Sequence, residues 1–236
     1  MSELREGPVR DAAGRAPGAA TIRLDVVSDA ICPWCYVGKR RLEEALRQLG
    51  PDGPAVEVCW RPFQLNPDMP RAGVERRAYR TAKFGSWERS QALDAQVAAA
   101  GAGEGLAFRH DLMARTPNTL DAHRLVRLAW REGGAGVQDA VVEGLFAAYF
   151  AEGRDIGDRR VLADVGGAAG LDRGRVGAML AGEEGSAEVR GEDLAARRSG
   201  LRGVPTFILD GTALFSGAQP AGLIAAGLRE AASAGR

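Results

Sequence analysis

The sequence predicts an α/β protein in which a βαβ unit and a ββα unit are separated by a long helical segment. Stretches with strand composition occur at residues 21–28 and 55–60, and again at 206–209 and 212–215. Between residues 70 and 199 almost no strand pattern is found, and so long a segment cannot be a loop. We therefore expect one sheet domain built from residues 21–66 and 200–236, with residues 67–199 forming an inserted helical subdomain.

The first unit is a strand, a helix and a second strand. Residues 21–28 read TIRLDVVS and residues 55–60 read AVEVCW, so both are rich in β-branched side chains. Between them, apolar residues recur at helical spacing until Gly50-Pro51 ends the helix, and Gly38 would let this helix pack closely against a neighbour. A unit of this length has parallel strands joined by a right-handed crossover.

Several helices are expected in the inserted segment. The clearest spans residues 118–131, with Asn118 as its cap and Gly133-Gly134 as its stop, and a second spans residues 137–151. Residues 85–100 are also expected to be helical. Shorter helices should begin at three capping residues, Asp158, Asp172 and Ser186. In the closing unit, Asp210-Gly211 is a hairpin turn between the last two strands, and a helix follows over residues 221–232.

The composition argues against several classes of partner. The chain has 236 residues with 31 basic and 31 acidic side chains and no basic run, so we expect neither nucleic acid nor a membrane as partner. No apolar run approaches the ~20 residues of a membrane span. Residues 1–20 are polar and rich in Gly, Pro and Ala, without the apolar core of a signal peptide. We expect a disordered tail and a cytoplasmic protein.

The motif Cys32-Pro33-Trp34-Cys35 lies where the first strand gives way to the helix. If Cys32 is the N-cap, its sulfur can accept the N–H of Cys35, and Pro33 falls at the first helical position, which suits proline. The partial positive charge of the helix N-terminus favours the thiolate of Cys32. Residues three apart on a helix are ~5 Å apart, within reach of a disulfide. One segment thus supplies an attacking thiolate and a resolving thiol.

Two other interpretations of the motif are weaker. A zinc site needs a second pair of ligands, and only Cys59, His110 and His123 remain, so we expect no metal. A structural disulfide would close a loop of three residues and stabilise the fold only weakly. Cys59 alternates with valines on its strand and is expected to behave as a small hydrophobic residue. Redox chemistry is therefore the favoured function.

Other residues could serve this site. Asp29, three positions before Cys32, could tune the proton affinity of that thiol or relay a proton, or it could simply order the loop. His123 could stabilise a thiolate or bind substrate at the mouth of the site, or be a packing histidine. Phe63 and Asn66 follow the second strand and could form a wall beside the motif, or a structured loop.

Several stretches of sequence occur in one characteristic order. They are Ser28–Arg41 around CPWC, Trp60–Pro67, Pro117–Arg124, Tyr149–Gly157, Gly203–Phe207 and Ser216–Pro220. Together they resemble the DsbA-like branch of the thioredoxin superfamily, and in particular its cytoplasmic FrnE-type members. The resemblance runs from about residue 22 to 230. It implies a thioredoxin fold interrupted by helices, with Pro205 as a cis-proline that faces the disulfide.

The resemblance also implies an activity and a substrate-binding loop. Cys32 would form a mixed disulfide with substrate, which Cys35 would resolve. The backbone beside the cis-proline would hold an extended substrate by strand-like hydrogen bonds, so that Val204 and Thr206 would bind substrate together with Pro33 and Trp34. The redox-active disulfide would replace a cofactor, with a low-molecular-weight thiol as a further candidate.

Two other functions stay open. The 2-hydroxychromene-2-carboxylate isomerases and kappa-class glutathione transferases look similar in plan, but they typically carry serine where this chain has Cys32, and they activate a bound thiol. A binding module or chaperone would use an apolar groove lined by Trp34, Phe63 and Pro205. In the favoured interpretation the partner is a protein or small molecule with a thiol or disulfide, and the chain is a monomer or a homodimer.

Overall fold

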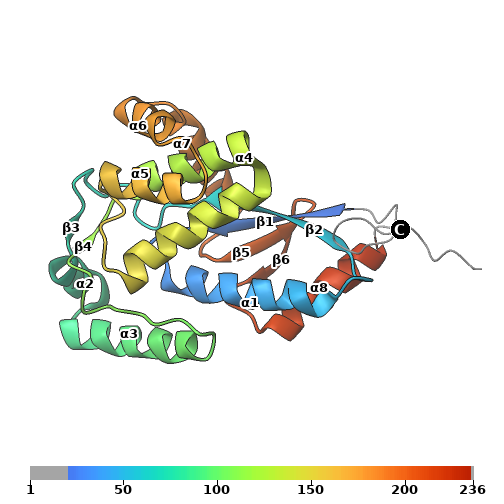
Figure 1. Cartoon of the computed structure of the whole chain (residues 1–236). Coiled ribbons are helices and arrows are strands. Elements are labelled where there is room, and N and C mark those ends of the chain that lie inside the picture. The colour runs from blue at the N-terminus through green and yellow to red at the C-terminus, as the bar shows by residue number, and fades with distance from the viewer. Residues whose placement is uncertain (1–20, 235–236) are drawn as a thin grey trace, which may run out of the picture.

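The computed structural model describes residues 21–234, and the tail expected over residues 1–20 lies outside them. A four-stranded sheet with the order β2-β1-β5-β6 forms the centre (Figure 1). β1 (Thr21–Ser28) pairs in parallel with β2 (Ala55–Pro62) and antiparallel with β5 (Thr206–Leu209), which pairs antiparallel with β6 (Thr212–Ser216). The predicted parallel unit and the predicted hairpin are both confirmed.

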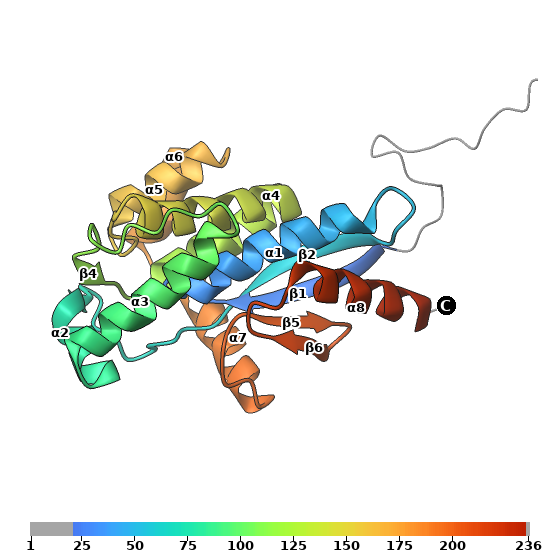
Figure 2. The same cartoon turned by 90° about the horizontal axis from the view of Figure 1, so that it is seen from below.

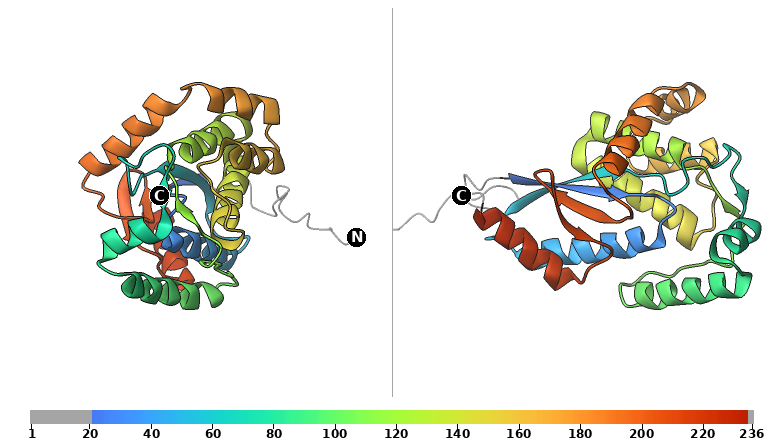
Figure 3. Two further views of the ribbon diagram at one scale, coloured as in Figure 1. Left: turned by 90° about the vertical axis from the view of Figure 1, so that its left-hand side faces the viewer. Right: turned by 180° about the vertical axis from the view of Figure 1, so that it is seen from behind.

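Helices cover the sheet on both sides. α1 (Pro33–Leu49) and α8 (Ala221–Ala234) lie side by side on one face, and α7 (Ser186–Arg198) lies on the opposite side from α8 (Figures 1 and 3). α4 (Leu120–Phe146) packs against β2. The strands bury their apolar residues between these helices, and Leu24, Val26 and Phe207 are completely buried. Within residues 21–234, no helix is both long and apolar enough to cross a membrane.

The helices predicted over residues 118–131 and 137–151 form one element. Gly134, with φ 69° and ψ −162°, kinks α4 instead of ending it, and the π-helix η1 (Ala147–Ala151) continues the chain. Thr119 is the residue that precedes α4, so the cap predicted at Asn118 is wrong by one position. The Asn118 side chain accepts the N–H of Leu120 instead, which satisfies a donor of the first turn from outside the helix.

The shorter helices begin close to their predicted caps. Asp158 and Asp172 cap α5 (Arg159–Ala168) and α6 (Arg173–Ala181), and each accepts a backbone N–H of the first turn. Ser186 is not a cap, because the left-handed Gly185 precedes α7. A glycine there turns the chain without the steric cost that a side chain would add.

α2 (Arg76–Phe84) and α3 (Trp87–Ala102) lie at the end of the molecule where α1 begins (Figures 1 and 2). The sequence predicted α3, but not α2 or the short ribbon of β3 (Val74–Glu75) and β4 (Arg115–Thr116). α2 reads RRAYRTAKF, with too few apolar residues to show a buried stripe. These elements form one wall of the site described next.

Candidate active site

The CPWC motif lies at the junction of β1 and α1. Cys32 is the N-cap, as predicted, and Pro33 begins the helix. The predicted capping bond is wrong: the N–H of Cys35 donates to the main-chain oxygen of Cys32, at 3.0 Å, and not to its sulfur. Because this turn already satisfies the donor, the sulfur is free for another contact. The Cys32 thiol donates to the carbonyl of Val204, with 3.6 Å between sulfur and oxygen.

The two thiols of the motif differ in their surroundings. Cys32 is 6% exposed and lines a cavity, whereas Cys35 is completely buried, and both are free thiols. Burial raises the pKa of the Cys35 thiol well above its usual range, and the neighbouring Cys32 raises it further, while contacts with Ser28 and the backbone of Asp29 oppose this shift. Cys35 therefore stays protonated at neutral pH, and Cys32 is the thiol that opens to the cavity.

The loop before β5 faces the motif. The Val204–Pro205 peptide bond is cis. A Cβ atom added to Gly38 would lie 3.0 Å from Cγ of Pro205, so the missing side chain lets α1 approach this loop closely, as predicted. Thr206 is buried and donates to the carbonyl of Gly203 at 2.9 Å. Its side chain thus supports the loop, and the contact of Thr206 with substrate stays a prediction.

A cavity of about 270 Å³ lies beside Cys32. Four predicted site residues line it: Cys32, Pro33, Trp34 and Asn66. Most of its remaining wall comes from residues 76–150, including Arg76, Arg80 and Lys83 of α2. Sequence reasoning missed these three residues because it missed the helix. Their spacing of four and then three residues, which places cations on one helical face, was the signal that could have found them.

Asp29 is completely buried and joins three segments of the chain. Its main-chain oxygen accepts the N–H of Cys32 at 3.0 Å, and its Oδ2 accepts the N–H of Leu65 at 2.7 Å. Its Oδ1 lies 3.3 Å from Nε2 of His123. These contacts order the loop between β1 and α1, which is one of the two roles expected of Asp29. The other role, in proton transfer or tuning, stays a prediction.

Two of the residues predicted to contact substrate, His123 and Phe63, do not line the cavity beside Cys32. His123 is 5% exposed, and its ring lies against Asp29 and outside the lining of the cavity. Phe63 is 3% exposed, and the guanidinium of Arg197 lies 4.3 Å from the centre of its ring. Phe63 directly follows β2 and His123 lies on α4, and both are buried where α4 and α7 pack against β2. Both side chains pack against their neighbours, and their contact with substrate stays a prediction.

Comparison with known families agrees with this geometry. The family model of the DSBA-like thioredoxin domain matches residues 23–229. The chain belongs to this family. A curated relative of this DSBA-like protein, the uncharacterized protein YwbO of Bacillus subtilis, is 47% identical over 47 residues. That match spans 20% of this chain and only 21% of the relative's length.

Solved structures share the fold over most of the chain. A probable DsbA oxidoreductase from Streptomyces coelicolor is 36% identical, with a TM-score of 0.78 and 91% of each chain covered. A 2-hydroxychromene-2-carboxylate isomerase is 16% identical, with a TM-score of 0.61 over 83% of this chain and 89% of that one. The cytosolic disulfide reductase DsbM from Pseudomonas aeruginosa, solved with GSH, is 20% identical, with a TM-score of 0.59 over 82% and 89%. The last two likenesses show the thioredoxin fold alone.

The third cysteine of this DSBA-like protein lies on β2, outside the motif. Cys59 is 1% exposed and pairs across the sheet with Asp25. Burial raises the pKa of its thiol, although Nη2 of Arg23 lies 3.5 Å from the sulfur. Among residues 21–234, no group of His, Cys, Asp and Glu side chains is arranged to hold a metal ion.

Proposed function

We propose that this DSBA-like protein catalyses thiol–disulfide exchange, with Cys32 as nucleophile and Cys35 as resolving thiol. The proposal rests on the different surroundings of the two thiols. Cys32 lines the cavity, whereas Cys35 is buried beside it and holds its proton. An exchange enzyme needs this order, because the accessible thiol must react first and the buried one second.

The two cysteines supply both electrons that the exchange requires. The Cys32 thiolate attacks one sulfur of a substrate disulfide, forms a mixed disulfide and releases the other sulfur as a thiolate, which takes up a proton. Cys35 then loses its proton and attacks the Cys32 sulfur, which forms the Cys32–Cys35 disulfide and releases the second substrate thiol. The substrate gains two electrons and the protein loses two. A dithiol or a low-molecular-weight thiol would restore the reduced protein, so no other cofactor is required.

We also assign substrate binding to the main chain at Val204. Its carbonyl accepts the Cys32 thiol, and this acceptor is released when Cys32 enters a mixed disulfide. An extended part of the substrate could then pair with the backbone beside Pro205 in the manner of an added strand. Pro33 and Trp34 supply neighbouring apolar contact, and the Trp34 side chain is 41% exposed.

We place this activity in the cytoplasm. A dithiol that must be kept reduced between turnovers suits a reducing compartment. One protein of the same fold is described as a cytosolic disulfide reductase, which supports this placement. The partner is then a protein or small molecule that carries a thiol or disulfide.

Trapping of the mixed disulfide tests the assignment of the two roles. The Cys35→Ser variant, treated with 2-hydroxyethyl disulfide, should accumulate one adduct on Cys32, because nothing resolves it. The Cys32→Ser variant should form no such adduct, and both variants carry Cys59 as an internal control. Peptide mass spectrometry locates the adduct. An adduct that forms on Cys35 as readily as on Cys32 would contradict the proposed roles.

A second candidate is a thiol-dependent isomerase or transferase that acts on a small molecule. The cavity beside Cys32 favours it, because a site of about 270 Å³ lined by cationic and aromatic side chains could hold an anionic thiol. The free pair of cysteines argues against it. If glutathione raised the melting temperature of the Cys32→Ser variant, and the wild type showed no dithiol–disulfide transition, this second function would be favoured.

A further inference from the structure

The cavity beside Cys32 has an excess of positive charge. Three cationic residues line it, Arg76, Arg80 and Lys83, against one carboxylate, Asp94. Nη2 of Arg76 lies 2.6 Å from one oxygen of Asp94, and Nη2 of Arg80 lies 2.7 Å from the other. A single carboxylate thus serves two guanidinium groups. With His110 uncharged, the lining carries a net excess of two positive charges, and Lys83 has no carboxylate of the lining as partner.

Lys83 contacts uncharged groups at this wall. Nζ of Lys83 lies 2.7 Å from the hydroxyl of Tyr79 and 3.3 Å from Oδ1 of Asn66. The Tyr79 hydroxyl also donates to Asn66 Oδ1. The amide nitrogen of Asn66 is buried and has no acceptor within the described structure. Because a buried donor without an acceptor is unfavourable, an acceptor brought by a ligand would bind here.

The neighbouring titratable groups experience the same positive field. Burial lowers the pKa of His110, and Arg76 and Arg80 lower it further, while Asp94 opposes them. Burial likewise lowers the pKa of Arg80, with Asp94 opposing and Arg76 adding to the shift. His110 is therefore uncharged at neutral pH and does not change the charge balance. An anion in the cavity would relieve the repulsion between the two arginines.

The remainder of the cavity is apolar and of limited size. Its wall includes Ile31, Leu65, Phe84, Val97, Met113 and Phe150. The volume of about 270 Å³ lies near the lower end of the range for small-molecule sites, roughly 300–1,000 Å³. Cys32 opens into this space and is only 6% exposed. The shape suits one small organic molecule better than a segment of a folded protein.

We propose that the substrate of Cys32 is a small organic disulfide that has an apolar body and an acidic group. The acidic group pairs with Lys83 and Arg80, and the sulfur lies at Cys32. The proposal rests on the exchange chemistry proposed above and names its substrate class. Attack by the Cys32 thiolate and resolution by Cys35 reduce this disulfide to two thiols, and the two electrons come from the Cys32–Cys35 dithiol.

Two aromatic disulfides, one anionic and one uncharged, test this substrate class. One is 5,5′-dithiobis(2-nitrobenzoate), which carries two carboxylates, and the other is 4,4′-dithiodipyridine, which is uncharged at pH 7.5. Stopped-flow absorbance gives the second-order rate constant of each with the reduced protein, and Cys32→Ser supplies the background. Each rate constant is divided by that of 2-mercaptoethanol with the same disulfide, which corrects for the leaving group.

Variants of Lys83 should change the ratio of the two normalised rates. Lys83→Met should lower the rate with the anionic disulfide roughly tenfold and the rate with the neutral one by less than about twofold. Lys83→Glu should lower the anionic rate further. Arg160→Gln is the matched control, because Arg160 is a 92% exposed cation outside the cavity lining and should change neither rate.

The outcomes separate the two proposals. An unchanged ratio in Lys83→Met and Lys83→Glu, with exchange at Cys32 intact, overturns the substrate class and leaves the exchange chemistry standing. The same holds if a peptide disulfide reacts faster than both aromatic disulfides and is insensitive to Lys83. If Cys32→Ser reacts as fast as the wild type with every disulfide, the exchange chemistry itself fails.

Discussion

Cys35 has two reasons to hold its proton, and one of them disappears during the proposed reaction. Burial is the larger reason and persists, whereas the contact with Cys32 lasts only while Cys32 carries an ionisable sulfur. When Cys32 enters a mixed disulfide, its sulfur is no longer ionisable, and its contribution to the raised pKa of Cys35 is lost. Cys35 then loses its proton more easily, at the step where it must attack. Formation of the mixed disulfide at Cys32 thus favours deprotonation of Cys35, the thiol that resolves it.

Alkylation should separate the two thiols. At pH 7 the Cys35→Ser variant, which keeps Cys32, should react with iodoacetamide at least roughly tenfold faster than Cys32→Ser. Because burial, the largest cause of the raised pKa of Cys35, persists without the Cys32 thiol, the rate of Cys32→Ser should rise only as the pH increases beyond the ordinary value of 9.0. The measurement is the loss of free thiol with time from pH 6 to 10, with Cys59 common to both variants. Equal rates at pH 7 would contradict the assignment.

A substitution at Gly38 tests the close approach of α1 to the loop before β5. Alanine usually stabilises a helix relative to glycine, by about 1 kcal/mol. At position 38 the new Cβ atom would lie 3.0 Å from Pro205, so we expect Gly38→Ala to lose that gain and to destabilise the protein by about 1 kcal/mol. Gly191→Ala in α7, where nothing lies within 4 Å, should be stabilising. Urea unfolding measures both, and a stabilising Gly38→Ala would refute the packing argument.

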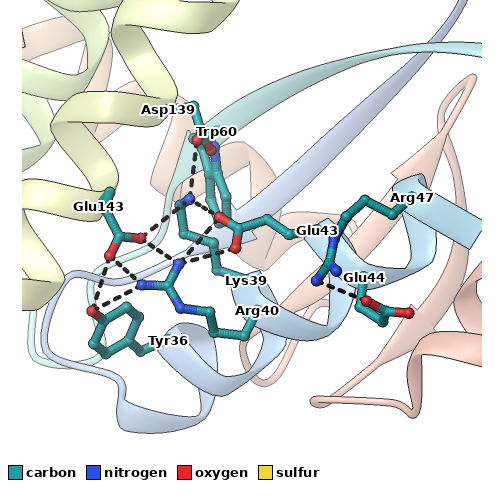
Figure 4. A network of polar contacts seen from close by, with 9 residues as sticks. All are labelled: Tyr36, Lys39, Arg40, Glu43, Glu44, Arg47, Trp60, Asp139 and Glu143. Carbon is teal, nitrogen blue, oxygen red and sulfur yellow. Dashed lines mark hydrogen bonds and ion pairs between the residues drawn. The ribbon is translucent and has the colours of Figure 1, made fainter. Parts of the chain in front are cut away.

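Among the elements, α1 carries the motif and is held to α4 by a network of ion pairs (Figure 4). Lys39 of α1 is 2% exposed, and its Nζ lies 3.0 Å from Asp139 and 3.2 Å from Glu143, both on α4. Arg40 also donates to Glu143, at 2.9 Å, and the Tyr36 hydroxyl donates to the same carboxylate at 3.0 Å. The network therefore fixes the helix whose N-terminus presents Cys32.

Removal of the central cation should weaken this contact. In Lys39→Met, three carboxylates that surround Nζ lose their shared partner, so we expect a loss of about 2 kcal/mol in the free energy of unfolding. Arg47→Gln is the matched control on the same helix, because its pair with Glu44 is exposed and should contribute less than about 0.5 kcal/mol. Denaturant unfolding measures both variants. Equal small losses would show that the network does not hold α1.

The same network predicts that the stability of the protein depends on pH. Burial alone would raise the pKa of Glu143, but the hydrogen bond and charge of Arg40 and the charge of Lys39 outweigh burial and lower it. A lowered carboxyl pKa contributes stability above the ordinary value of 4.5, and this stability is lost as the pH falls through the folded-state value. Glu143→Gln should therefore be less stable than the wild type at pH 7, and the difference should shrink toward pH 3. Thermal unfolding from pH 3 to 7 tests the trend, and a difference that grows toward pH 3 would contradict it.

At the scale of the whole molecule, sequence patterns predicted the features that neighbouring residues in the chain determine. The β-branched stretches and the turn at Asp210-Gly211 predicted the strands and their hairpin, and Cys32 and Pro33 predicted the start of α1. The cavity depends on long-range packing, and no local pattern shows it. α2 lacks an apolar stripe, so the sequence did not predict the cationic wall. The burial of Phe63 and His123 where α4 and α7 pack against β2 is likewise a tertiary effect that no local pattern shows.

The most direct test of thiol–disulfide exchange is the redox equilibrium of the Cys32–Cys35 couple. The protein is equilibrated with dithiol–disulfide buffers of defined potential, and the fluorescence of Trp34, which lies between the two cysteines, reports its state. We predict a reversible two-electron transition, about 30 mV for each tenfold change in the equilibrium ratio, that is abolished in Cys32→Ser. No transition in the wild type, or a transition that persists in Cys32→Ser, would contradict the proposed function.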